Sequence, residues 1–187
     1  MKTKNIERYL NSFGKYIVKQ SKANLTRGQS PYGTKNATKA LYNSLSFKVE
    51  EDDNGFSLKL FMLDYGKFID KGVSGKTKIR EYTTYDGRKV ASPYQYTNRM
   101  PPPSALDKWI VRRGLAPRKK SGQFTGRKID KVGFAKSIQF LVARKIFFQG
   151  IKSSSFFQRP IGLGLQRFGK DILKAIKQDI IDTVNNN

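Results

Sequence analysis

Carboxylates are the first side chains to consider for chemistry in this 187-residue chain, because it contains no cysteine and no histidine. Their absence excludes disulfides, zinc sites built on thiolate or imidazole, and Ser-His-Asp catalysis. Four consecutive acids, Glu50 to Asp53, match no calcium-loop spacing and favour a solvated hairpin tip, or one that meets a basic face of a neighbouring copy. Asp64 and Asp70 alone are too few carboxylates for a two-metal nuclease.

Glycine-rich and apolar segments give no sign of a cofactor or a membrane anchor. The sequence Gly162-Leu163-Gly164 follows no strand pattern and lacks the dinucleotide fingerprint, so close helix packing is the better interpretation. No apolar run approaches the ~18 residues of a membrane span, and the N-terminus lacks the apolar region of a signal peptide. We therefore expect no cofactor, no metal and no membrane partner, in a protein made in a cytoplasm.

Positive charge is the strongest signal in the composition. The chain has 37 Lys and Arg against 14 Asp and Glu, a formal net charge of +23. Residues 71–170 hold 23 of these cations and only 4 of the acids, a net of +19. Such a field attracts nucleic acid, an acidic protein face or an anionic membrane, and the alternative is a highly soluble lysine-rich surface.

Two basic segments are candidates for polyanion contact. Residues 115–130 have the composition of a basic linker, and a solvated loop is an equally good interpretation. Residues 76–100 interleave cations with tyrosines, which suits nucleic acid and a protein interface equally well. The candidate residues are Lys76, Lys78, Arg80, Arg88, Lys89, Arg118, Lys119, Lys120, Arg127 and Lys128.

Apolar periodicity predicts the elements of the first half of the chain. Residues 3–21 have the spacing of an amphipathic helix, and a loop follows to residue 34. A short helix is expected over 35–45, with Thr34 as a possible N-cap. Alternating apolar residues on either side of Asn54-Gly55 predict an antiparallel hairpin with strands over 45–51 and 55–63.

A brief helical turn is expected directly after this hairpin. Tyr65, Phe68 and Ile69 recur at helical spacing, and Gly72 stands in the position of a C-cap. A second hairpin, with strands over 77–85 and 88–96 around Asp86-Gly87, is expected to project from the body of the protein.

The second half of the chain is predicted to be mainly helical. A helix capped by Ser104 contains Trp109, which is more often a core or interface anchor than a ligand platform. Further helices are expected over 131–149 and from about Pro160, which suits a first helical turn, to about residue 184.

The order of these elements resembles the neck and tail-completion proteins of tailed bacteriophages. The resemblance covers about residues 35–75 and 104–184. In its first part a helix with a small residue, Leu and Ser precedes two strands, and an aromatic turn then ends in an acid and a glycine. The matching positions are Ala40, Leu41, Ser44, Tyr65, Phe68, Asp70, Gly72 and Val73. In its later part a Phe-Pro-like stretch precedes the final helix, at Phe156, Phe157, Arg159 and Pro160.

The resemblance implies an α+β fold: a small antiparallel β-sheet with flanking helices, to which the periodicities add a projecting β-hairpin and a long C-terminal helix. It further implies a single connector domain over 1–187, present as a six- or twelve-fold ring between portal and tail in the virion, assembled in the bacterial cytoplasm. No catalysis belongs to that role. The expected partners are other copies, a portal, other neck or tail proteins, and genomic DNA through phosphate attraction.

Within that role, one set of residues is expected to pack inside the subunit or against the next one. These residues are Tyr65, Phe68, Ile69, Gly72, Trp109, Phe156, Phe157 and Pro160. A basic DNA- or RNA-binding accessory protein without catalytic activity is the second hypothesis, and an enzyme is the third.

Overall fold

The computed structural model describes residues 4–26, 39–52, 55–106 and 131–185. These residues fall into two compact units. The described residues of the first unit lie within 1–71, 82–90 and 153–187, and those of the second lie within 72–81 and 91–152. Each unit is built from segments far apart in the sequence, so long-range contacts hold each of them together.

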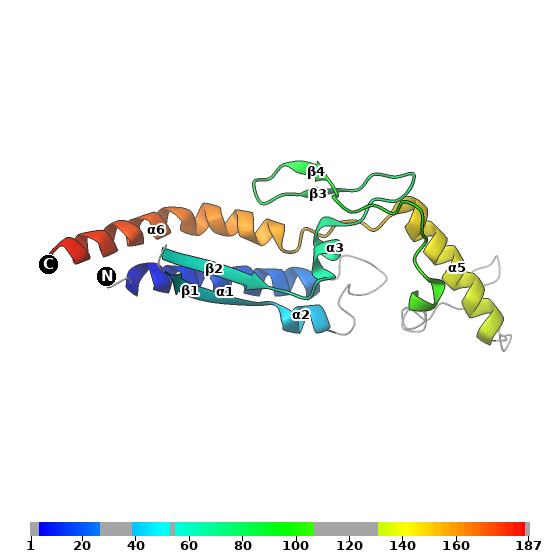
Figure 1. Ribbon diagram of the computed structural model, residues 1–187, viewed down its shortest axis with the longest axis horizontal. Helices are drawn as coiled ribbons and strands as arrows, with labels where there is room; N and C mark the ends of the chain where they lie inside the picture. Colours follow the sequence, from blue (N-terminus) through cyan, green and yellow to red (C-terminus); the bar gives the residue numbers. More distant parts are fainter. Residues whose placement is uncertain (1–3, 27–38, 53–54, 107–130, 186–187) are drawn as a thin grey trace. The chain divides into compact units, whose positions relative to one another are not determined.

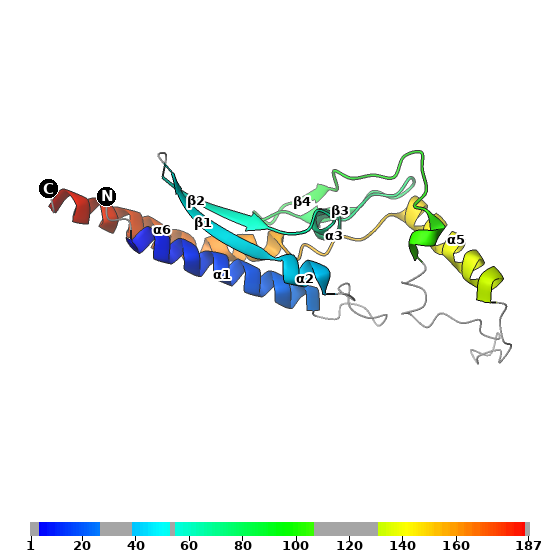
Figure 2. The same ribbon diagram turned by 60° about the horizontal axis from the view of Figure 1, so that its bottom comes forward.

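Two antiparallel helices, α1 (Lys4–Thr26) and α6 (Gln158–Asn185), form the body of the first unit and lie side by side in Figures 1 and 2. The start of α1 meets the end of α6 through Asn5 and Asp179. Further along, the rings of Tyr16 and Phe168 lie 5.4 Å apart. At Gly164 an added Cβ would come within 2.7 Å of the Phe13 ring, so the absence of a side chain there lets the helices approach.

A two-stranded antiparallel sheet covers another side of α1. Its strands are β1 (Ser46–Asp52) and β2 (Gly55–Phe61), paired in register from Ser46 with Phe61 to Asp52 with Gly55. Phe47 pairs with Leu60 on the apolar face, and the Phe47 ring packs on Gly14 of α1. The opposite face is mostly polar: Lys48 pairs there with Lys59 and Glu50 with Ser57, and Phe61 is the apolar residue at its end.

The core of the first unit lies where the sheet, α1 and the start of α6 meet two short helices, α2 (Ala40–Ser44) and α3 (Gly66–Lys71). Each of its fully buried apolar residues is 2% exposed or less, and partly buried apolar residues pack around them. The buried residues are Leu25, Leu41, Leu45 and Phe156, and the surrounding ones are Val18, Met62, Ile69 and Phe157.

The second unit is organised around the C-terminal end of α5 (Lys131–Gln149). Residues 73–77 run beside residues 147–151: Val73 pairs with Ile151, and the Lys76 N–H donates to the Phe147 carbonyl at 2.8 Å. A Cβ on Gly75 would lie 2.1 Å from the Phe148 carbonyl oxygen, so this close approach requires glycine. A short 3₁₀ helix, η1 (Pro103–Leu106), also contacts α5.

The second hairpin is much shorter than the sequence predicts. Its strands are β3 (Glu81–Thr83) and β4 (Lys89–Ala91), joined by a turn in which Gly87 has φ of 88°. The prediction of strands over 77–85 and 88–96 was wrong in extent, because backbone groups at the outer ends of the predicted strands bond to other segments. Thr77 donates to Phe148, and Ser74 exchanges backbone hydrogen bonds with Tyr94 and Tyr96.

The architecture is α+β, with helices, a small antiparallel sheet and a long C-terminal helix, as the sequence predicts. The predicted bounds of β1, β2, α5 and α6 agree with the structure to within about two residues. Helix α1 continues five residues beyond the predicted end at residue 21, to Thr26. Thr34, part of the short helix predicted over 35–45 and most of the helix capped by Ser104 lie outside the described residues.

Candidate functional site

The turn at residues 63–73 ends in a buried carboxylate that caps another helix. Helix α3 holds Asp70 at 1% exposure. The Asp70 Oδ1 accepts hydrogen bonds from the backbone N–H groups of Phe157 at 2.8 Å and Gln158 at 3.3 Å. These groups stand at the start of α6, where N–H groups have no partner within the helix. The turn therefore fixes the beginning of the long helix.

Burial determines the protonation balance of this carboxylate. Burial raises the pKa of the Asp70 carboxyl above its ordinary value, and the hydrogen bonds from Phe157 and Gln158 and the charge of Lys71 oppose the shift without cancelling it. Because the carboxyl faces the start of α6 and is almost fully buried, a substrate could not reach it. Asp70 is a structural cap rather than a catalytic acid or base.

The serine-rich segment before α6 strengthens the same junction. The Ser154 N–H and Oγ both donate to the Ile69 carbonyl, at 3.0 and 2.7 Å, and the Ser155 N–H donates to the Asp70 carbonyl. The Ser155 Oγ in turn accepts from the Thr83 N–H at 3.2 Å, so the tip of the second hairpin is attached to this segment. A Cβ on Gly162 would lie 2.0 Å from the backbone oxygen of Tyr85, so the absence of a side chain at Gly162 lets the hairpin tip approach α6.

A second buried aspartate caps a helix start at the other end of the helix pair. Asp179 of α6 is 2% exposed. Its Oδ1 accepts from the Asn5 side-chain amide at 2.8 Å, and its Oδ2 accepts from the Ile6 N–H at 2.9 Å. Asp179 thus caps the start of α1, as Asp70 caps the start of α6. The two carboxylates fix both ends of the antiparallel pair.

Four of the residues predicted for packing lie inside the first unit. Phe156 is fully buried, and Ile69 and Phe157 pack against the same core. Pro160 is buried within the first turn of α6, as its fixed φ suits.

The other four residues predicted for packing have different positions. Tyr65 and Phe68 are 42% and 37% exposed, so both rings present a large part of their surface to solvent. Gly72 follows α3 with φ of 72°, the left-handed conformation of a helix-ending glycine. Trp109 lies outside the described residues.

The predicted polyanion contacts are divided between the two units. Lys76 and Lys78 are exposed in the second unit, where Arg80 donates from Nε to the Gln149 carbonyl at 2.7 Å. Arg88 and Lys89 are exposed near the hairpin tip of the first unit, and Arg88 pairs with Asp86. The five candidates of the basic linker lie outside the described residues: Arg118, Lys119, Lys120, Arg127 and Lys128.

Helix α6 carries an exposed apolar stripe beside the face that packs on α1. Leu173 and Val184 are 68% and 69% exposed, and Leu165 and Ile180 exceed 40%. The spacing of these residues places them along one side of the helix, and Gly169 among them has open space around its Cα. We call Leu165, Gly169, Leu173, Ile180 and Val184 the α6 stripe.

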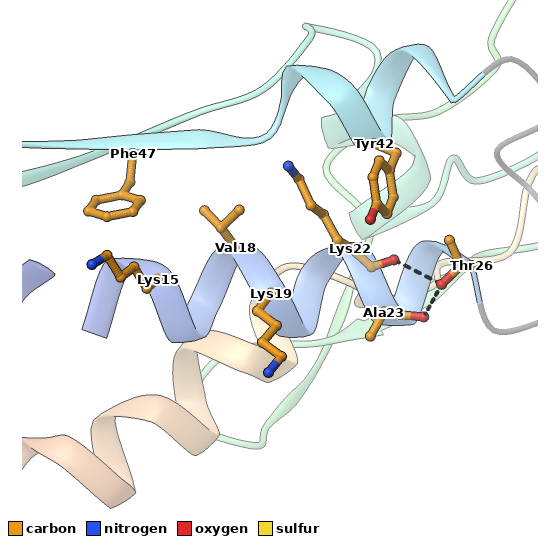
Figure 3. A pocket seen from close by; sticks show the side chains of 8 residues that line it. All are labelled: Lys15, Val18, Lys19, Lys22, Ala23, Thr26, Tyr42 and Phe47. Carbon is orange, nitrogen blue, oxygen red and sulfur yellow. Dashed lines mark hydrogen bonds between the residues drawn. The ribbon is translucent and has the colours of Figure 1, made fainter. Parts of the chain in front are cut away.

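A basic groove on the first unit was not predicted from the sequence. It lies between α1 on one side and α2 and β1 on the other, and has a volume of about 530 Å³. Figure 3 shows Val18 and Lys22 projecting toward Tyr42 and Phe47, with Lys19 pointing away from these two rings. The groove is lined by Lys15, Val18, Lys19, Lys22, Ala23, Thr26, Tyr42 and Phe47.

This groove carries positive charge, and no described carboxylate forms an ion pair with its lysines. The Lys22 ammonium lies 5.1 Å from the centre of the Tyr42 ring. Among the described residues, no carboxylate forms an ion pair with Lys15, Lys19 or Lys22. The sequence does contain a signal for this: residues 8–49 include eight Lys and Arg and no Asp or Glu. This excess of positive charge does not by itself predict a groove, because lysines on an amphipathic helix normally form its solvated face.

The described residues contain no cluster of three or more side chains suited to holding a metal ion. Within the same ranges, no helix is both long enough and apolar enough to span a membrane. The geometry offers instead buried caps that stiffen the first unit, an uncovered apolar stripe and a basic groove. These features suit binding and assembly.

Comparison of the chain with protein-family models, with curated proteins and with solved structures found no match.

Proposed function

We propose that the chain is a structural protein of a tailed-phage virion, without catalytic activity, that forms a ring in the neck between portal and tail. The order of the motifs at residues 35–75 and 104–184 supports this proposal, and so does the α+β architecture. Its partners would be further copies of itself, a portal or other neck and tail proteins, and the DNA that passes through the ring. Assembly would take place in the cytoplasm of the bacterial host.

The observation that carries this proposal is the α6 stripe. Large apolar side chains with exposures from 43% to 69% repeat along one side of a 28-residue helix. Burying such surface contributes roughly 25 cal/mol per Å², so a helix of this kind gains stability from a covering partner. In a ring, identical copies supply that cover, and symmetry repeats each contact around the assembly.

The buried caps give this helix the rigidity that a connector needs. Asp70 and Asp179 fix the start of α6 and the start of α1, so the stripe is held on a defined pair of helices. Tyr65 and Phe68, both partly exposed on the turn before and within α3, offer a further aromatic surface to a neighbour. Excess positive charge would face the DNA through phosphate attraction without base readout.

Mass photometry of the purified chain, alone and with a portal added, tests this proposal. We expect particles of six or twelve copies. Leu173→Glu with Ile180→Glu should shift the particles to single copies, because both changes place a charge in the stripe. The matched control is Lys170→Gln with Lys174→Gln, which lowers the net charge by the same two units on exposed positions of α6 and should leave the particle mass unchanged.

A basic nucleic-acid-binding accessory protein is the second candidate function, and the basic groove is the observation that favours it. Under this alternative the chain would be a single copy that binds DNA or RNA with a steep salt dependence. Single copies in mass photometry, together with loss of DNA binding between 50 and 200 mM salt, would favour this alternative over the ring.

A further inference from the structure

We propose that the basic groove between α1, α2 and β1 binds a short segment of single-stranded nucleic acid. The inference does not depend on ring formation, since every residue that it uses lies within the first unit. It also assigns the contact to a surface other than the cations of residues 76–100 and 115–130.

The lysines of α1 provide the phosphate contacts. Lys15, Lys19 and Lys22 follow one another at four and three residues, so their Cα positions lie about 6 Å and about 4.5 Å apart along the helix axis. All three line the groove, and the Lys19 side chain points away from the two rings. A single strand carries one phosphate per nucleotide, so flexible lysine side chains at these positions can each reach a phosphate. Because no described carboxylate pairs with them, their charge is available to an anion.

The opposite wall of the groove provides surfaces for bases. Tyr42 of α2 and Phe47 of β1 line it, and Val18 adds an apolar side chain from α1. Aromatic rings stack with bases of any sequence, so they suit a strand held without sequence preference. The 5.1 Å between the Lys22 ammonium and the Tyr42 ring places a phosphate-binding cation and a stacking surface within the span of one nucleotide.

The size and sign of the groove favour a single strand over a duplex or an acidic peptide. A volume of about 530 Å³ accepts ligands of nucleotide size. A duplex keeps its bases stacked inside, so its bases could not reach Tyr42 and Phe47, whereas the bases of a single strand could. An acidic peptide would use the cations but has no requirement for the two aromatic side chains. The combination of regularly spaced lysines and aromatic rings is the pattern of proteins that bind single strands.

Fluorescence anisotropy with a fluorescein-labelled twelve-nucleotide oligothymidylate tests this inference. Lys15→Gln, Lys19→Gln and Lys22→Gln together should weaken binding at least tenfold at 50 mM salt. They should also reduce the slope of log affinity against log salt by about 2, since each phosphate contact on a single strand contributes ~0.7. Tyr42→Leu should weaken binding at least fivefold and leave the slope unchanged, because stacking releases no counterions.

The matched control removes three cations elsewhere in the first unit: Lys170→Gln, Lys174→Gln and Lys177→Gln, all at exposed positions of α6. We expect this control to weaken binding less than threefold, with circular dichroism melting curves that show both triple variants folded. Equal losses in the two triple variants would overturn the inference, because binding would then follow net charge alone. Oligoglutamate of equal charge competing as well as unlabelled oligothymidylate, or a duplex binding more tightly through the same lysines, would also overturn it.

Discussion

Replacing Asp70 separates two contributions of the buried cap, its hydrogen bonds and its charge. Asp70→Ala removes the acceptor for the N–H groups of Phe157 and Gln158. A lost cap costs about 0.5–2 kcal/mol, and leaving buried donors without a partner costs about 1–3 kcal/mol. We expect a total loss of about 2–3 kcal/mol in the free energy of unfolding, or a Tm lower by roughly 5–10 °C for a chain of this size.

Asp70→Asn keeps an oxygen acceptor at the same place and removes the charge. Burial raises the pKa of the folded-state carboxyl, so the folded protein holds this proton at a higher pH than the unfolded chain. An unfolded aspartate titrates near pH 4, and above that pH the wild type loses stability until the folded-state pKa is passed. The stability of Asp70→Asn relative to the wild type should therefore increase as the pH rises from about 4 toward 7.

Urea unfolding followed by circular dichroism at several pH values measures these differences. Using the difference between two variants cancels the other carboxylates, which titrate over the same range. Hydrogen exchange of the peptide spanning residues 153–165 adds a local measurement, because Asp70→Ala should speed exchange at the start of α6 and Asp70→Asn should not.

Two results would refute the reasoning on Asp70. If Asp70→Asn destabilises as much as Asp70→Ala, the charge and not the acceptor makes the cap. If the wild type gains stability relative to Asp70→Asn as the pH rises, attraction to the start of α6 and to Lys71 outweighs burial, and the direction of the pKa shift is wrong.

Further predictions concern the other cap and two glycines of α6. Asp179→Ala should lower the free energy of unfolding by about 1–2 kcal/mol and speed hydrogen exchange at the start of α1. The control Asp171→Ala removes an exposed ion pair and should lower it by less than about 0.5 kcal/mol. Equal losses in the two variants would contradict the capping role. Gly162→Ala should lower Tm because its Cβ would meet the Tyr85 carbonyl, and Gly169→Ala should raise stability by about 0.5–1 kcal/mol because its Cβ would meet open space. A destabilised Gly169→Ala, or an unaffected Gly162→Ala, would show that the contacts around α6 differ from those described.

Local patterns in the sequence were sufficient to predict most of the regular elements. The alternation on either side of Asn54-Gly55 predicts β1 and β2, and apolar spacing predicts α5 and α6. The second hairpin was predicted too long because tyrosines, threonines and cations alternate there without a strong apolar face. Backbone hydrogen bonds of residues 74–77 with residues 94–96 and 147–148 limit its strands, and the local pattern does not reveal these long-range contacts.

The caps and the groove depend on contacts that the sequence order does not reveal. Asp70 meets Phe157 across 87 residues, and Asp179 meets Asn5 across 174. The resemblance includes Asp70 as the acid that ends the aromatic turn but gives it no partner, and Asp179 resembles an ordinary surface residue in the sequence. The groove requires α2 and β1 to fold back over α1, and the periodicity of α1 alone does not predict this.

Electron-microscopy class averages of the purified chain, alone and mixed with a portal, test most directly whether this protein acts as one of many identical copies. The account predicts closed rings with six or twelve copies, which Leu173→Glu with Ile180→Glu abolishes without lowering Tm. Single copies at every concentration, with and without the portal, would contradict it.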